Sequence, residues 1–200
     1  MFTFILLFAC SFLEADSFKL MGGLNLIKYS SFPSTRNADW RLNIGLCVGA
    51  GIEFDLTENK RLAIEIDGMM IQKKGTLTID PSRPDLNTDY NLSTISVPAL
   101  AKIKPITGIP FYFFGGGVGS LVLSHKYSTN KNQKDLKEDT KTVDFGFVAG
   151  IGYEAKINFF QNIFIEARYQ RGFLNLLRFP KDDESLKSHA LLIIVGIKTD

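Results

Sequence analysis

The sequence predicts an all-β fold: a single eight-stranded antiparallel transmembrane β-barrel with a polar lumen and an apolar exterior, preceded by a signal peptide. Three observations predict it. Apolar and polar residues alternate along most of the 200-residue chain, as in strands with one apolar face. The connections between the alternating segments are short and long in turn. Charged residues concentrate on one face of most segments, opposite the apolar residues.

The segment LNIGLCVGAGIEFDL, from Leu42 to Leu56, shows the alternation most clearly. Its even positions are all apolar, whereas its odd positions are small, polar or charged. A strand of a soluble protein is usually about five or six residues long, and a tilted strand needs about nine to eleven residues to cross a bilayer. This segment is therefore long enough to cross a membrane and to project beyond it.

The N-terminus, MFTFILLFACSFLEA, is an apolar run that ends near the small residue Ala15. It is too short for a transmembrane helix and has the length of a signal-peptide core. We therefore expect a signal peptide over residues 1–15 and one barrel domain over residues 17–200. Cleavage would leave Cys47 as the only cysteine, which excludes an internal disulfide. We interpret Cys47 as a small side chain that fills an interior strand position.

Eight segments carry the alternation or a continuous apolar run. In six of them one face is apolar and the other is small, polar or charged, whereas Pro110 to Ser124 and Ser188 to Lys198 are apolar on both faces, so their orientation is open. The predicted strands are Ser17 to Ser30, Leu42 to Leu56, Arg61 to Lys73, Asn91 to Lys104, Pro110 to Ser124, Thr142 to Ala155, Ile163 to Leu176 and Ser188 to Lys198.

The connections test the barrel independently, because outer-membrane barrels have short periplasmic turns and longer external loops. Short connections cover residues 57–60, 105–109 and 156–162. Long connections cover residues 33–40, 75–90, 125–141 and 177–187 and hold most of the prolines. Short and long connections interleave throughout, which places both ends of the barrel domain in the periplasm.

The cost of burying charge in lipid decides which face points inward. A Lys or Arg on the lipid face near the midplane costs about 2–4 kcal/mol, so the charged faces must line the lumen. A lipocalin-like soluble barrel has the opposite arrangement. The predicted lumen residues are Glu53, Asp55, Glu65, Asp67, Lys102, Asp144, Glu154, Glu166 and Arg168. We interpret them as a structural network of paired charges, and the alternative is a general acid and base.

Aromatic residues near the strand ends are candidates for interfacial girdles, or are ordinary strand-end aromatics. Tyr29, Trp40 and Tyr90 lie near the outer loops, and Tyr112, Phe159 and Phe160 lie near the inner turns. A separate feature is the glycine-rich stretch at residues 115–119. It is not followed by a helix, as a phosphate-binding loop requires, so we interpret it as allowing close packing or a bend in a tightly curved barrel.

Five segments occur in this order along the chain: LAIEIDGMMIQKKG, STISVPALAKIKP, FYFFGGGVGSLV, DFGFVAGIGYEA and IFIEARYQRGFLNLL. In this order they resemble the segments of the PorT-like outer-membrane β-barrel family of Gram-negative bacteria. The resemblance covers about residues 18–197 and implies a location in the cell outer membrane. The family's namesake is implicated in protein export by the type IX secretion pathway. The chain departs from the pattern at Ser96, where the family often has a carboxylate, and in lacking a terminal aromatic residue.

These observations favour a structural or interaction protein, accessory to protein secretion or envelope integrity, over an enzyme. We expect no catalytic, cofactor-binding or metal-binding residues. The alternative is a lipid-modifying enzyme in which His125 acts beside Ser124 or Ser128, or His189 beside Ser185 or Ser188. The expected partners are outer-membrane lipid or lipopolysaccharide, partly through the lysine-rich loop at 125–141, and secretion or envelope proteins. No basic stripe with interleaved aromatics points to nucleic acid.

Overall fold

The computed structural model describes residues 15–32, 39–78, 88–106, 108–129, 132–135, 141–158, 161–174 and 185–199. The predicted signal peptide lies almost wholly outside these residues. The strands are β1 (Ser17–Phe32), β2 (Asp39–Asp55), β3 (Leu62–Thr78), β4 (Thr88–Ile103), β5 (Phe111–Thr129), β6 (Asn132–Asp135), β7 (Val143–Asn158), β8 (Gln161–Gly172) and β9 (Ser185–Thr199). No helix among the described residues is long and apolar enough to cross a bilayer.

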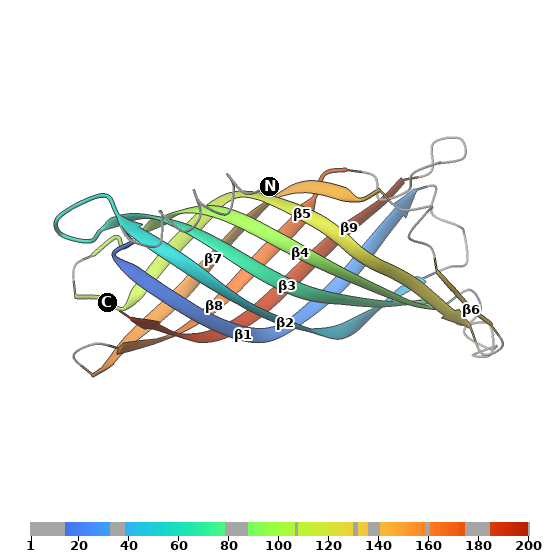
Figure 1. Ribbon diagram of the computed structural model, residues 1–200, viewed down its shortest axis with the longest axis horizontal. Coiled ribbons are helices and arrows are strands. Elements are labelled where there is room, and N and C mark those ends of the chain that lie inside the picture. The colour runs from blue at the N-terminus through green and yellow to red at the C-terminus, as the bar shows by residue number, and fades with distance from the viewer. Residues whose placement is uncertain are drawn as a thin grey trace, which may run out of the picture.

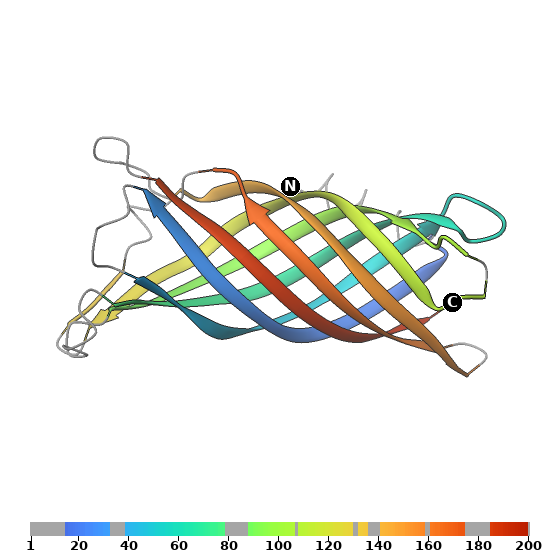
Figure 2. The same cartoon turned by 180° about the vertical axis from the view of Figure 1, so that it is seen from behind.

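The strands close into an antiparallel barrel of eight strands, as predicted. Strands that follow one another in the chain pair, except that β5 pairs directly with β7, while the short β6 pairs only with the outer end of β5. Pairing of β1 with β9 completes the ring. The strands run obliquely to the long axis of the barrel (Figures 1 and 2). Closure leaves the wall with no free sheet edge, so its backbone groups find partners without water.

The strand β6 corrects the prediction of a loop over residues 125–141. In the structure β5 continues to Thr129, and β6 pairs with its outer end through residues 132–135. Figure 1 shows this hairpin at the end of the barrel opposite the C-terminus. Polar residues form strand here because the backbone ladder continues into water, where strict apolar alternation is no longer required.

The outer surface of the wall is apolar along most of its length. Exposed large hydrophobic side chains occur on every strand of the wall, among them Leu24, Leu46, Met70, Val97, Phe113, Phe145, Ile165 and Val195. The inward positions between them are buried. The predicted orientation of the two faces is therefore the observed one, including an interior position for Cys47, which is 5% exposed.

The structure describes the side chain of only one of the six aromatic residues suggested for the girdles. Tyr112 is fully buried inside the barrel, so its assignment to the inner girdle was wrong. The side chains of the other five candidates lie outside the described part. An aromatic cluster that was not predicted lies on β7, on β8 and just after β8, where the ring of Phe147 is 5.9 Å from that of Tyr169 and 5.7 Å from that of Phe173.

An apolar layer fills part of the lumen and explains the two strands without clear alternation. Its members are at most 5% exposed: Met21, Ile27, Cys47, Met69, Ile71, Leu92, Val122, Phe164, Ala190, Leu192 and Ile194. The strand β9 supplies Ala190, Leu192 and Ile194 to this layer, and β5 supplies Val122. The inward residues Tyr112, Phe114 and Val118 of β5 join Leu100 and Val148 in a second buried apolar cluster. Apolar residues therefore face lipid on one side of these two strands and other apolar residues of the lumen on the opposite side.

Inward glycines make room for large lumen side chains. A Cβ atom at Gly152 of β7 would collide with the ring of Tyr112, and one at Gly150 would collide with the ring of Phe114. Each aromatic ring therefore lies flat across a glycine of the neighbouring strand. This packing also directs the Tyr112 hydroxyl toward the centre of the barrel.

We expect Gly152→Ala to lower the free energy of unfolding by about 1–3 kcal/mol, because the added methyl group overpacks the lumen against Tyr112. The matched control is Gly117→Ala, since a Cβ atom at Gly117 meets nothing within 4 Å. The control should change stability by no more than about 0.5 kcal/mol. Urea unfolding in lipid vesicles measures both, and equal midpoints for the two variants would contradict the packing argument.

The arrangement of turns predicts that residues 56–61 face the periplasm and that the β5–β6 hairpin faces outward. In a background lacking Cys10 and Cys47, we expect Ser128→Cys to react with a membrane-impermeant maleimide on intact cells. Asn59→Cys should react only after the outer membrane is permeabilised. The reverse pattern would invert the orientation.

Candidate functional site in the lumen

The inward charges form two groups that meet inside the barrel. One group, called here the middle layer, consists of Lys19, Glu65, Asp67, Glu166 and Arg168. The other, called here the mouth layer, lies nearer the short turns and consists of Glu53, Lys102, Lys104, Glu154 and Lys198. Seven of the nine residues predicted to line the lumen belong to these layers. The middle layer comes from β1, β3 and β8, and the mouth layer comes from β2, β7, β9 and the end of β4.

Arg168 is the centre of the middle layer. Its guanidinium group on β8 lies 2.5 Å from an oxygen of Asp67 and 3.0 Å from one of Glu65, both on β3. It also contacts Glu166 at 2.5 Å. The side chain is 1% exposed, so these charges are withdrawn from water. A planar fork with five donors suits three carboxylates better than an ammonium group does.

Lys19 and Tyr112 complete the middle layer. The ammonium group of Lys19 lies 2.7 Å from Glu65 and 2.9 Å from Glu166, and 4.3 Å from the centre of the Phe164 ring. The hydroxyl of Tyr112 donates to Glu166 at 2.6 Å. Glu166 therefore receives hydrogen bonds from a lysine, an arginine and a tyrosine, which offset the cost of burying its charge.

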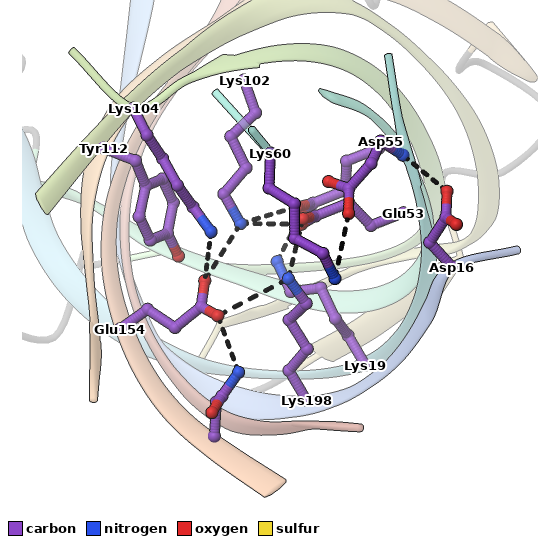
Figure 3. Close-up of polar contacts among 12 residues, drawn as sticks. Asp16, Lys19, Glu53, Asp55, Lys60, Lys102, Lys104, Tyr112, Glu154 and Lys198 are labelled. Carbon is purple, nitrogen blue, oxygen red and sulfur yellow. Dashed lines mark hydrogen bonds and ion pairs between the residues drawn. The ribbon is translucent and has the colours of Figure 1, made fainter. Parts of the chain in front are cut away.

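The mouth layer is built mainly from lysines (Figure 3). Glu53 accepts hydrogen bonds from Lys102 at 2.7 Å and from Lys198 at 2.8 Å. Glu154 lies 3.5 Å from each of Lys102, Lys104 and Lys198, and accepts from the Asn162 amide at 2.9 Å. Lys102 also lies 3.9 Å from Glu65, which links the two layers.

The two remaining predicted residues lie away from these layers. Asp55 ends β2 at the short turn and pairs with Lys60 at 3.3 Å. Asp144 is the second residue of β7, toward the opposite end of the barrel, where it is 5% exposed and accepts a hydrogen bond from the Leu174 amide at 3.3 Å. Neither is joined to the layers by a direct ion pair in the described structure.

Sequence reasoning left Lys19, Lys104, Lys198 and Tyr112 out of the network, although Lys104 was assigned to the same strand face as Lys102. The alternation of β1 did indicate that Lys19 shares a face with Asn25. Lys198 lies near the end of a strand that is apolar on both faces. A single charge at a strand end gave little information on which face of that strand points into the lumen. Tyr112 lies in the run Phe111 to Phe114, where both faces are aromatic, so only the position of Gly152 reveals its direction.

The two histidines occupy different environments. His125 faces the lumen and is 4% exposed. His189 faces outward, where its Nδ1 atom lies 2.9 Å from the Tyr169 hydroxyl. The adjacent Ser188 is buried inside the barrel and accepts a hydrogen bond from Lys73 at 3.5 Å. The suggested Ser188–His189 pair is therefore wrong, because neighbouring residues of a strand face opposite sides.

The closed barrel with an apolar outer surface and a packed, charge-paired lumen defines an outer-membrane β-barrel protein. The model of the outer membrane protein beta-barrel domain family matches residues 16–178, and the chain belongs to that family. No curated protein matches it.

Two solved structures show the same fold at low sequence identity. Ail, the attachment invasion locus protein of Yersinia pestis, is 13% identical with a TM-score of 0.50, and the match covers 91% of this chain and 97% of Ail. Neisserial surface protein A is 15% identical with a TM-score of 0.51, over 91% of this chain and 96% of the neisserial protein. The protein is thus an outer-membrane barrel.

Removing the guanidinium group of Arg168 should destabilise the barrel strongly. We expect Arg168→Met to lower the free energy of unfolding by about 3–5 kcal/mol, because three buried carboxylates then share Lys19 as their main cation. Adding Asp67→Asn should restore about 1 kcal/mol or more by removing one unpaired charge. Unfolding in lipid vesicles measures both variants. If the double variant loses as much stability as the two single variants added together, the pairing of Arg168 with Asp67 is contradicted.

Proposed function

We propose that the protein is a structural and interaction protein of the outer membrane, accessory to protein secretion or envelope integrity. The observation that carries the proposal is the packed lumen. Two layers of paired charge and two buried apolar clusters fill the interior of the described barrel. An eight-stranded barrel is just wide enough for side chains to fill, so its accessible surfaces are the external loops, the turns and the lipid face.

The secretion role is the finer part of this proposal. It is supported by the resemblance of five ordered segments to the PorT-like family, whose namesake is implicated in type IX export. A rigid barrel suits such a role because it anchors two sets of connections at fixed positions on opposite sides of one membrane. Partner proteins would then be recognised by those connections, and lipopolysaccharide by the outer end.

The test compares the secreted and surface proteomes of a deletion strain with those of its parent. We expect exported cargo to be lost from both fractions and to return when the gene is supplied in trans. A second arm measures sensitivity to detergent and bile salts, which reports envelope integrity. Unchanged export with a changed permeability would move the role to the envelope, and no change in either would overturn the proposal.

The histidines provide a separate check on enzyme activity. We expect the His125→Gln/His189→Gln variant to restore export as fully as the wild type, and to leave the lipid A composition measured by mass spectrometry unchanged. The physical reason is that His125 is enclosed in the lumen, and that Ser188 and His189 lie on opposite sides of the wall. Altered lipid A in this variant, with normal amounts of folded barrel, would support the lipid-modifying alternative.

A further inference from the structure

The barrel opens at its short-turn end into a cavity of about 340 Å³. This is within the range of about 300–1,000 Å³ that is typical of small-molecule sites. Five cationic side chains and a single acidic one line it: Lys60, Arg61, Lys104, Lys156, Lys198 and Glu154. They come from the β2–β3 and β4–β5 turns and from β7 and β9, so the fold brings together charges that are far apart in the sequence.

The positive excess follows from how the inward charges are divided. In the middle layer, two cations face three carboxylates. In the mouth layer, the three lysines 102, 104 and 198 face only Glu53 and Glu154. Lys102 and Lys198 already donate to Glu53, and all three lysines lie 3.5 Å from Glu154. The excess of negative charge therefore lies deep in the lumen, in the middle layer, and the excess of positive charge lies at the opening.

The exposure of the lining groups leaves the cationic side of the cavity open to ligands. The side chain of Lys104 is 25% exposed and that of Lys60 is 58% exposed, whereas Glu154 is 9% exposed. Lys60 and Lys104 are therefore more accessible to a ligand from the turn end than the carboxylate of Glu154 is. Clefts lined by charge of one sign concentrate ligands of the opposite sign.

We propose that this cavity binds a phosphate group. Several ammonium groups converge on it from different strands, and charge-assisted hydrogen bonds from separate directions suit a tetrahedral, multiply charged oxyanion. The cavity also has an apolar rim, at Ile106 and Ile109, which are 54% and 41% exposed. This rim would contact the apolar part of an amphiphile. The phosphate belongs either to a phospholipid headgroup or to a soluble phosphate ester.

The test uses the purified full-length barrel and the variant Lys104→Gln/Lys156→Gln. The matched control is Lys74→Gln/Lys126→Gln, which removes two exposed lysines from outside the cavity and changes the net charge equally. Binding of inorganic pyrophosphate is followed by calorimetry in a zwitterionic detergent. Retention of phosphatidylglycerol, with phosphatidylcholine as reference, is followed by native mass spectrometry.

We expect the cavity variant to weaken binding by about tenfold or more, because it removes two charge-assisted contacts, and the control variant to bind like the wild type. Cavity-dependent binding of pyrophosphate would identify a soluble phosphate ester, and cavity-dependent retention of phosphatidylglycerol alone would identify a lipid headgroup. Equal losses in the two variants would reflect net charge only and overturn the proposal, as would an absence of binding. Urea unfolding of all three proteins verifies that each is folded.

Discussion

The structure depends on one constraint: backbone groups inside a bilayer must find hydrogen-bond partners within the protein. Pairing of β1 with β9 meets this constraint by closing the sheet. Closure by eight strands makes the interior so narrow that side chains from distant strands touch, as when Lys19 of β1 reaches Glu65 of β3 and Glu166 of β8. Alternation then sends every second residue into this narrow space. The inward residues must therefore pack against one another or pair.

Both solutions occur in this lumen, and they meet there, since the Phe164 ring of the apolar layer lies 4.3 Å from the ammonium group of Lys19. The charges are gathered so that one cation serves several carboxylates, most clearly at Arg168, while the apolar layer encloses residues such as Ile27 and Leu192. Buried ion pairs often stabilise no better than well-packed apolar residues. Their added value here is geometric, because the fork of Arg168 fits Asp67 and Glu65 only in one register of β8 relative to β3.

The architecture was accessible from the sequence because lipid imposes a strict rule on the outer face. Alternation and the sequence of short and long connections sufficed for eight strands, their order and the inward direction of Glu53 and Glu166. The alternation rule weakens where both faces of a strand are apolar, so the inward direction of Tyr112 could be recognised only from Gly152, a residue of another strand. The rule no longer applies outside the membrane, where β6 forms from polar residues. Pairings such as Lys198 with Glu53 join residues 145 positions apart and depend on closure itself.

The packed interior also constrains how the two ends of the protein can act. Lys102 lies 2.7 Å from Glu53 in the mouth layer and 3.9 Å from Glu65 in the middle layer, so the two layers share a cation. An anion at the mouth meets Lys104 and Lys60 first, both more exposed than Lys102. Such a ligand can add charge at the opening without breaking the deeper pairs. Binding of the proposed phosphate at the turn end would therefore leave the middle layer to keep the strands in register.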